Sequence, residues 1–229
     1  MHVVVNTVPP DRTRSAATRS VATLPTALGT TALKDQLAEV TRQLALAMTL
    51  LADKERECDE LAQALTQQAH RDALTGLYNR RKFNALCASE ITRHARYGSP
   101  VALIMIDIDH FKAINDHHGH LVGDLALVDV TRALGEHVRA ADALCRWGGE
   151  EFVVLAPHTD LASAVTVAEK LRSIVAETAF EAVRHITCSF GVAVLQPGDG
   201  VVDLVRRADT CLYRAKRNGR NRVEPHTGA

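Results

Sequence analysis

The residues best suited to chemistry are carboxylates that follow an apolar segment or a tight turn. They are Asp107, Asp109, Glu150 and Glu151. The first two end the apolar run Val101–Ile108, and the last two follow Gly148-Gly149, a pair that accepts unusual backbone conformations and lets a ligand approach the main chain. If strand and turn are neighbours in a sheet, Asp107 and Glu150 can face each other across one Mg²⁺, which binds a few carboxylates together with substrate phosphates. Taken alone, each acidic cluster is more typical of a solvated loop.

A basic cluster near the C-terminus offers a complementary charge. Lys216, Arg217 and Arg220 surround the expected end of a helix, and Gly219 stops it. Basic side chains stabilise the negative end of a helix dipole, and this accounts for Arg217. Lys216 and Arg220 can instead reach triphosphate oxygens, and their spacing alone leaves both readings open.

The elements that must position these residues alternate between helix and strand from about Asp72 onward. Expected helices cover 80–96, 122–138, 160–178 and 201–217, and expected strands cover 101–108, 144–147, 152–156, 186–195 and 222–224. The glycine pair between the second and third of these strands is a strong hairpin signal. The pattern predicts a single α/β domain, residues 71–229, in which helices pack on a sheet.

Residues 31–70 contain no Pro or Gly and repeat on a heptad. One seam position takes Leu37, Leu44, Leu51, Cys58 and Leu65, and its partner takes Leu33, Val40, Ala47, Lys54, Leu61 and Gln68. A narrow apolar seam of about five heptads predicts a coiled coil that pairs two chains. The alternative is one amphipathic helix lying on its own domain. Residues 1–30 have no clear period and are expected to form a flexible leader.

The bulk composition bounds the function further. Lys plus Arg and Asp plus Glu both number 27, and this balance argues against nucleic-acid binding. The 5 cysteines include no closely spaced pair and indicate reduced thiols in a cytoplasmic protein. No apolar run reaches the roughly 18 residues of a membrane span, and no signal peptide is recognisable.

The blocks taken together, in their order, resemble the GGDEF-domain diguanylate cyclases from about Asp72 to Glu224. The matching blocks are Asp72–Arg81 (DALTGLYNRR), Asp107–Asp116 (DIDHFKAIND) continuing to Gly123-Asp124, Arg146–Phe152 (RWGGEEF), Ser189–Ala193 (SFGVA), Ala208–Lys216 (ADTCLYRAK) and Gly219–Asn221 (GRN). A lone GGEEF would be a weak signal, whereas this ordered set is specific. The second acidic residue of the signature is Glu in place of Asp, which keeps the carboxylate.

The resemblance implies a palm-like nucleotidyl cyclase fold with a central, mostly antiparallel sheet flanked by helices, and it assigns roles residue by residue. Asp107, the main-chain carbonyl of Ile108 and Glu150 would hold Mg²⁺, for which Mn²⁺ can substitute. Asn115 and Asp124 would read the guanine edge. The residues that would line or grip the triphosphate are Phe111, Lys112, Lys216 and Arg220, with Gly148 and Gly149 close to the substrate. Glu151 would support the metal site and assist deprotonation of the attacking hydroxyl.

The implied reaction condenses two GTP molecules into cyclic di-GMP and two pyrophosphates. Each domain would hold one GTP, so the resemblance implies a homodimer, and the heptad seam gives that pairing a physical basis. Arg139 and Asp142 match the RxxD motif of the family, which implies a product-inhibition site. Lys170 and Arg172 on the next expected helix are candidates to complete that site. Asp72, Asn79 and Arg80 are expected to join the N-terminal helix to the domain through hydrogen bonds and ion pairs.

Other functions remain open at this point. A catalytically silent GTP- or cyclic di-GMP-binding regulator would keep the fold and lose signature carboxylates, and an adaptor would lose the nucleotide contacts. A cyclase for another nucleotide is disfavoured by Asp124, because family members that accept adenine carry a serine there. The loop histidines at 110, 117, 118 and 120 suggest zinc, but they lie within a segment that the resemblance already explains.

Overall fold

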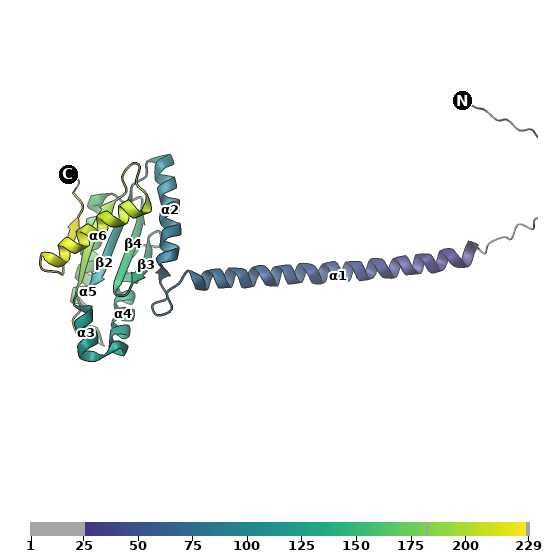
Figure 1. Cartoon of the computed structure of the whole chain (residues 1–229), viewed down its shortest axis with the longest axis horizontal. Helices are drawn as coiled ribbons and strands as arrows, with labels where there is room; N and C mark the ends of the chain where they lie inside the picture. The colour runs from purple at the N-terminus through teal and green to yellow at the C-terminus, as the bar shows by residue number, and fades with distance from the viewer. Residues whose placement is uncertain (1–25, 182, 228–229) are drawn as a thin grey trace, which may run out of the picture. The chain divides into compact units, whose positions relative to one another are not determined.

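The computed structural model describes residues 26–181 and 183–227 (Figure 1). The chain divides into two compact units, residues 1–60 and 61–229. Helix α1 (Thr26–Ala69) begins inside the segment expected as leader, and the rest of that segment lies outside the described residues. Among the described residues, no helix is both long and apolar enough to cross a membrane.

Helix α1 is one continuous helix of 44 residues (Figure 1). Its seam side chains Leu37, Leu44 and Leu51 are exposed to solvent in the single chain. A long isolated helix gains little stability in water, and most helical stability in proteins comes from packing of an apolar face. The helix therefore presents the row of leucines that the heptad pattern predicts, and none of the described residues of the 1–60 unit covers it.

The second unit is built on a sheet whose described strands follow the order β1-β3-β4-β2-β5-β6. The strands are β1 (Tyr78–Asn79), β2 (Val101–Ile108), β3 (Ala143–Gly148), β4 (Glu151–Pro157), β5 (Cys188–Val194) and β6 (Val223–Pro225). The central pairs β3–β4, β4–β2 and β2–β5 are antiparallel, and the edge pairs β1–β3 and β5–β6 are parallel. The expectation of a mostly antiparallel sheet flanked by helices is confirmed.

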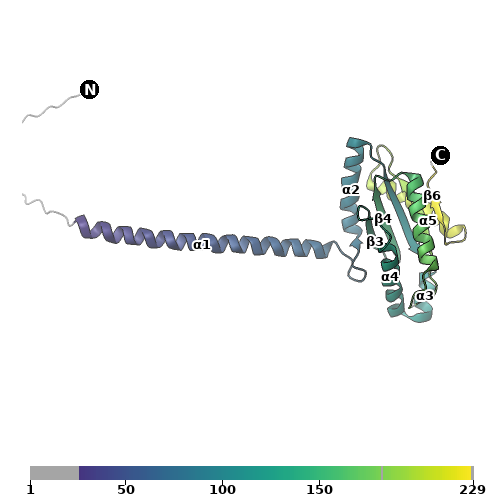
Figure 2. The ribbon, with the colours of Figure 1, turned by 180° about the vertical axis from the view of Figure 1, so that it is seen from behind.

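Helices cover both faces of this sheet (Figures 1 and 2). They are α2 (Arg80–Tyr97), α3 (Phe111–His118), α4 (His120–Gly135), α5 (Leu161–Glu177) and α6 (Val201–Arg217). Even-numbered residues of β2 pack with α4 and α5, and odd-numbered ones pack with α2 and α6. Because both faces are covered, every residue of β2 is buried, and all of its side chains are apolar except that of Asp107.

Helix α3 is absent from the sequence-based expectation, which placed one helix over 122–138. The structure instead has a helical hairpin, because Gly119 at φ 84° separates α3 from α4. Gly123 lets the two helices approach closely: a Cβ there would stand 1.9 Å from Asn115 Oδ1 and 3.3 Å from a Phe111 ring carbon. Eight residues with a mixed polar composition give too short a period to recognise from sequence.

Candidate active site

The site begins where the C-terminal end of β2 lies beside the N-terminal end of β4. Asp107 is in register with Glu151, and the Ile108 N–H donates to the Glu150 carbonyl at 3.3 Å. Opposed residues of an antiparallel pair place their side chains on the same face, so Asp107 and Glu151 share the face covered by α6. Strand and turn are therefore sheet neighbours, which was the condition for Asp107 and Glu150 to act together.

The Arg146 side chain holds the Gly148-Gly149 turn through hydrogen bonds. Gly149 adopts φ 50°, in the left-handed region that glycine enters without strain. The Arg146 guanidinium donates to the Gly149 carbonyl from Nε at 3.0 Å and from Nη2 at 2.8 Å, and its Nη1 donates to Asp72 Oδ1 at 2.9 Å. One side chain thus ties the signature turn to the segment that precedes β1.

Asp72 is held by more than Arg146. Its Oδ1 also accepts from the Thr75 backbone N–H at 2.9 Å and from the Thr75 hydroxyl at 2.7 Å. Burial acts to raise the pKa of Asp72, but the hydrogen bonds from Thr75 and Arg146 outweigh it and hold the pKa below its ordinary value. The Asn79 amide donates to the Ala69 and Arg71 carbonyls and caps α2. Of the three residues expected to join the helix to the domain, Asn79 therefore bonds to the last residue of α1, whereas Asp72 pairs with Arg146 and Arg80 lies over the Trp147 ring.

The ionised form of Asp107 is disfavoured by its surroundings. It is 5% exposed, and its Oδ2 accepts from Lys216 Nζ at 2.7 Å. Burial raises the pKa of Asp107 to about 6, against the opposing effect of Lys216 and with added repulsion from Glu150 and Glu151. Glu150 and Glu151 lie near Asp107, which is buried and has one ion-pair partner. A cation bound at this position would therefore be favourable.

Glu151 lies among charges from three elements. Burial raises its pKa, Lys216 and Arg80 oppose that effect, and Asp209 and Glu150 reinforce it. The Arg80 guanidinium stands 4.3 Å from the centre of the Trp147 ring, directly beside the signature turn. Sequence reasoning missed Asp209. Its position two helical turns before Lys216 on α6 was the available signal, because residues at that spacing share a helix face.

Asp109 belongs to the scaffold, although sequence reasoning grouped it with the possible cation ligands. Its carboxylate accepts from the Thr187 hydroxyl at 2.7 Å, the Ser189 hydroxyl at 2.6 Å and the Asn221 backbone N–H at 3.0 Å. The side chain is 5% exposed. With these donors in place, Asp109 fastens β2 to β5 and to the segment after α6, and this role explains its charge.

The hairpin of α3 and α4 carries the residues expected to read the base. Phe111 is buried beneath it, Asn115 lies against the backbone of Gly123, and Asp124 is exposed one residue further on. The close approach at Gly123 therefore brings the side-chain amide of Asn115 on α3 beside the start of α4. Lys112 is exposed on the same short helix.

The basic residues after α6 adopt a tight reversal. Gly219, Arg220 and Asn221 all have positive φ, and the Arg220 N–H donates to the Ala215 carbonyl at 3.0 Å. Arg220 is exposed, whereas Lys216 is half-buried against Asp107. The structure thus separates the two cations that sequence reasoning grouped together.

Arg139 and Asp142 lie on a turn in which the Asp142 N–H donates to the Arg139 carbonyl at 3.0 Å. Both line an open cavity of about 320 Å³ together with Arg71 and Tyr78. Burial raises the pKa of Asp142, while Arg139 opposes that effect. Lys170 and Arg172 are not among its lining residues. Arg172 instead donates to Glu169 and Asn221.

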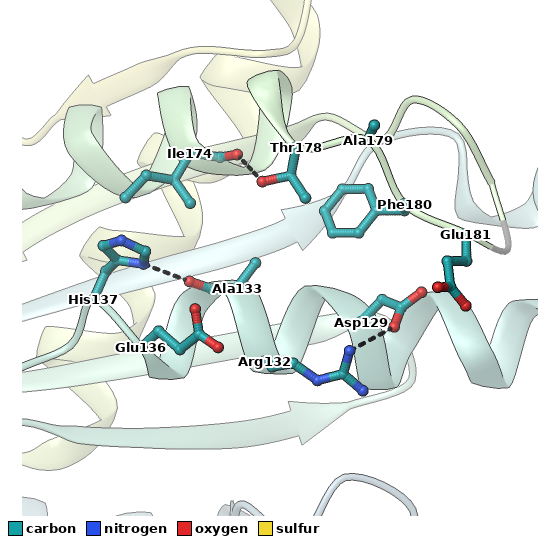
Figure 3. Close-up of a pocket in the computed structure, with 10 residues that line it drawn as sticks. All are labelled: Asp129, Arg132, Ala133, Glu136, His137, Ile174, Thr178, Ala179, Phe180 and Glu181. Atoms are coloured by element: carbon teal, nitrogen blue, oxygen red, sulfur yellow. Dashed lines mark hydrogen bonds and ion pairs between the residues drawn. The ribbon is translucent and has the colours of Figure 1, made fainter.

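A further cavity of about 280 Å³ lies between α4, α5 and the segment that follows α5 (Figure 3). Its polar groups are largely engaged within the helices, as Arg132 pairs with Asp129 and the Thr178 hydroxyl donates to the Ile174 carbonyl. No residue assigned to substrate, metal or inhibitor lines it. The chemistry predicted from sequence therefore lies elsewhere on the domain.

The donor set at the end of β2 suits Mg²⁺ better than a metal held entirely by protein. Within the described residues, no three His, Cys, Asp or Glu side chains converge as a ready-made metal cage. Asp107 and Glu150 both offer oxygen ligands, and the pKa of Asp107 is raised mainly by burial, with a smaller contribution from repulsion by Glu150. Mg²⁺ characteristically binds one or two carboxylates and completes its shell with water and phosphate oxygens.

Residues 69–222 match the family model described as diguanylate cyclase, GGDEF domain. The chain is 41% identical over 167 residues to the diguanylate cyclase DgcM of Escherichia coli K12, covering 73% of this chain and 41% of DgcM. It is 44% identical over 158 residues to the response regulator PleD of Caulobacter vibrioides, covering 66% of this chain and 35% of PleD. The chain thus spans less than half the length of these relatives.

Solved structures give the same answer. The coiled coil and GGDEF domain of DgcB from Caulobacter crescentus, in complex with c-di-GMP, aligns with a TM-score of 0.69 at 31% identity, covering 84% of this chain and 98% of that one. The active GGEEF domain of a diguanylate cyclase from Vibrio cholerae aligns with a TM-score of 0.63 at 38% identity, covering 66% and 98%. The fold, the matched motifs and the sequence identity agree, and this chain belongs to the GGDEF-domain diguanylate cyclase family.

Proposed function

We propose that this chain is a diguanylate cyclase that condenses two GTP molecules into cyclic di-GMP and two pyrophosphates. The observation that carries the proposal is the meeting of Asp107, Glu150 and Glu151 with Lys216 at one end of the sheet. A silent regulator would be expected to lose part of this set. The retained Asn115 and Asp124 likewise argue against an adaptor.

The proposed step forms one phosphodiester bond and breaks one phosphoanhydride bond. The 3′-hydroxyl oxygen of one GTP attacks the α-phosphorus of the other, pyrophosphate leaves with the bonding electrons, and the hydroxyl proton is released. The same exchange with the roles reversed closes the ring. Glu151 is the proposed acceptor of the proton, since burial raises its pKa toward the range useful for general base catalysis.

The residues proposed to hold Mg²⁺ are Asp107, the Ile108 carbonyl and Glu150. When bound, the cation supplies charge neutralisation at the reacting phosphate and lowers the pKa of the attacking hydroxyl. Lys216 neutralises Asp107 at 2.7 Å in the ligand-free chain. We propose that a bound triphosphate draws Lys216 onto its oxygens together with Arg220, while Phe111, Lys112 and the Gly148-Gly149 turn line the phosphates.

Guanine recognition is assigned to the α3–α4 hairpin. A carboxylate accepts from the N1–H and 2-amino groups of guanine, and an amide can both donate and accept at the base edge. Asp124 and Asn115 supply these groups, and Gly123 between them permits their close approach. Adenine lacks the donors that Asp124 would satisfy, so the pair favours GTP over ATP.

Two further parts of the proposal concern control. Each domain holds one GTP, so two chains must bring their sites face to face, and the seam of α1 is the proposed means of pairing them. Arg139 and Asp142 form the proposed inhibitory site for cyclic di-GMP. An arginine fork can bind phosphate or guanine, and an aspartate can bind the guanine edge.

The first test is to incubate the purified chain with GTP and Mg²⁺ and to look for cyclic di-GMP by chromatography. Glu150→Ala should abolish the product, and the exposed Glu177→Ala on α5 should not. Binding of GTP without any product from the unmodified chain would support the silent-regulator alternative. ATP offered in place of GTP should give no product.

The inhibitory site has its own test. Arg139→Ala should leave initial turnover intact and relieve the inhibition caused by added cyclic di-GMP. Arg93→Ala, which removes an exposed arginine on α2 outside that cavity, is the matched control. Inhibition that persists undiminished in Arg139→Ala would reject this assignment without affecting the proposed reaction.

A further inference from the structure

The segment that follows α6 reverses direction through three consecutive residues in the left-handed region. Gly219, Arg220 and Asn221 adopt φ values of 111°, 60° and 44°. Glycine enters this region without strain, and asparagine does so more readily than most residues, whereas for arginine it is unfavourable. Contacts from elsewhere in the domain must therefore hold Arg220 in this conformation.

Those contacts converge on the residue after Arg220. The Arg220 N–H donates to the Ala215 carbonyl at 3.0 Å, and this bond closes the end of α6. The Asn221 N–H donates to Asp109 Oδ2 at 3.0 Å, and the Asn221 side-chain oxygen accepts from Arg172 Nη1 at 3.0 Å. Asn221 is thus held through its backbone by the residue that follows β2 and through its side chain by α5.

The Arg172 guanidinium is fixed before it reaches Asn221. Its Nε donates to Glu169 Oε2 at 2.7 Å within α5, and its Nη2 donates to the Ser173 hydroxyl at 3.3 Å. The Arg172 side chain is 24% exposed. Because its other nitrogens are occupied, the planar guanidinium presents Nη1 to Asn221 in one orientation.

The side chain of Arg220 is not held in the same way. Across the described part of the chain, its guanidinium has no hydrogen-bond or ion-pair partner, whereas Lys216 is paired with Asp107 at 2.7 Å. Arg220 is also exposed. The position from which its guanidinium starts is therefore set by the backbone reversal alone.

Asp109 links this reversal to the proposed metal site. It lies two residues after Asp107, and its carboxylate also accepts from the Thr187 and Ser189 hydroxyls. The strand end that carries Asp107 is thus the same one that holds the Asn221 backbone. A cation bound there and the Arg220 guanidinium would keep a fixed spacing.

We propose that Asn221 and Arg172 are positioning residues, which hold the backbone of Arg220 so that its guanidinium is ready to meet the triphosphate of GTP. Neither residue touches the substrate in this role. A group that is ordered before binding loses less freedom when the ligand arrives, so the benefit appears as nucleotide affinity. The inference rests on the proposed function, because it takes Arg220 to grip the triphosphate.

The decisive measurement is a double-mutant cycle on the affinity of the full chain for 3′-deoxy-GTP with Mg²⁺, followed by calorimetry. This nucleotide carries the triphosphate and lacks the attacking hydroxyl, so it binds without reacting. Arg220→Ala should weaken binding about tenfold or more. Arg172→Ala should weaken it about fivefold in the unmodified chain, and less than about twofold in a chain that already carries Arg220→Ala.

A second variant and a control accompany the cycle. Asn221→Ala removes the acceptor for Arg172, keeps the N–H that donates to Asp109, and should repeat the pattern of Arg172→Ala. The control is Arg206→Ala, which removes an exposed arginine paired with Asp203 at 2.8 Å, three residues earlier on α6. It should leave the affinity unchanged, and circular dichroism should show the same helix content in every variant.

The outcomes separate this inference from the function on which it rests. Unchanged affinity in Arg172→Ala, or losses that add in full when it is combined with Arg220→Ala, overturns the positioning role. Formation of cyclic di-GMP from GTP by the unmodified chain would then leave the proposed reaction intact. Unchanged affinity in Arg220→Ala overturns this inference together with the assignment of Arg220 to the triphosphate. Absence of product from GTP contradicts the reaction, while the cycle, which measures binding alone, still decides the positioning role.

Discussion

Two aspartates separated by one residue should respond oppositely to the same substitution. Asp107→Asn and Asp109→Asn each replace a nearly buried carboxylate, 5% exposed in both cases, by a neutral side chain of the same shape. We expect the first to stabilise the fold and abolish turnover. We expect the second to destabilise the fold. The contrast follows from the partners of each carboxylate.

Asp107 destabilises the fold at neutral pH in the absence of metal. Its pKa of about 6 lies roughly two pH units above the 3.8 of an ordinary aspartate, which corresponds to about 3 kcal/mol as an upper limit. Between these two values the folded chain binds more protons than the unfolded chain, so stability falls as pH rises from about 4 to about 6. Asparagine is neutral throughout, so Asp107→Asn removes that fall and gains about 1–3 kcal/mol at pH 7.

Asp109 has the opposite balance. Thr187, Ser189 and Asn221 all donate to it, and a neutral amide accepts through one oxygen only. Hydrogen bonds to a charged group contribute about 1.5–3 kcal/mol each, and a buried donor left without a partner adds its own desolvation cost. Since the hydroxyl donors can rotate, we expect a net loss of about 2–4 kcal/mol for Asp109→Asn.

The assay is urea unfolding without metal at pH 4.5 and pH 7, followed by cyclic di-GMP formation with Mg²⁺. Asp107→Asn should have a higher midpoint at pH 7 than the unmodified chain and a smaller difference at pH 4.5. If Asp107→Asn were as destabilising as Asp109→Asn, the separation into a metal-site carboxylate and a scaffold carboxylate would be refuted. Retained turnover in Asp107→Asn would contradict its proposed place in the metal site.

Three further predictions concern the residues around the site. Gly123→Ala should raise the KM for GTP at least tenfold, because the added Cβ would stand only 1.9 Å from the side-chain oxygen of Asn115. Gly135→Ala, on the same helix, is the control: its Cβ would meet nothing within 4 Å, and the KM should stay unchanged. Arg146→Ala should lower kcat by about tenfold to a hundredfold through loss of two bonds to the glycine turn, and Arg146→Lys should recover only part of it, since it cannot reproduce the fork. Arg80→Gln should move the acidic limb of the pH–rate profile to higher pH, because Arg80 lowers the pKa of Glu151, and Arg80→Lys should move it back; an unchanged limb in both would exclude Glu151 as the titrating base.

Much of the fold was predictable because its signals are local. The buried strand 101–108 opens with six consecutive apolar residues, the hairpin is marked by two glycines, and the long N-terminal helix repeats every seven residues. The hairpin of α3 and α4 was not predicted, since its closeness depends on Gly123 meeting Asn115 across a turn. No local period records that contact.

The candidate site shows the same division. The motif blocks identified the acidic and basic residues, and the β2–β4 register brought Asp107 beside the signature turn, as required. The strand-end pattern alone did not distinguish Asp107 from Asp109, the family resemblance gave a metal role to Asp107 only, and Asp209 was overlooked. Their difference depends on donors from β5 and from the chain after α6, which lie about 80 to 110 residues away in sequence.

The sequence by itself thus determined the family, the α/β class, the heptad repeat of α1 and the identity of the candidate reactive side chains. These depend on residue type, spacing and period, which are properties of the linear chain. Only the tertiary structure decided that Asp109 has its hydrogen-bond donors, that burial raises the pKa of Asp107, and that Lys216 is the cation paired with Asp107. Burial and charge are sums over neighbours brought together by folding, so a pKa, an ion pair or a close approach at a glycine exists only once the distant elements have packed.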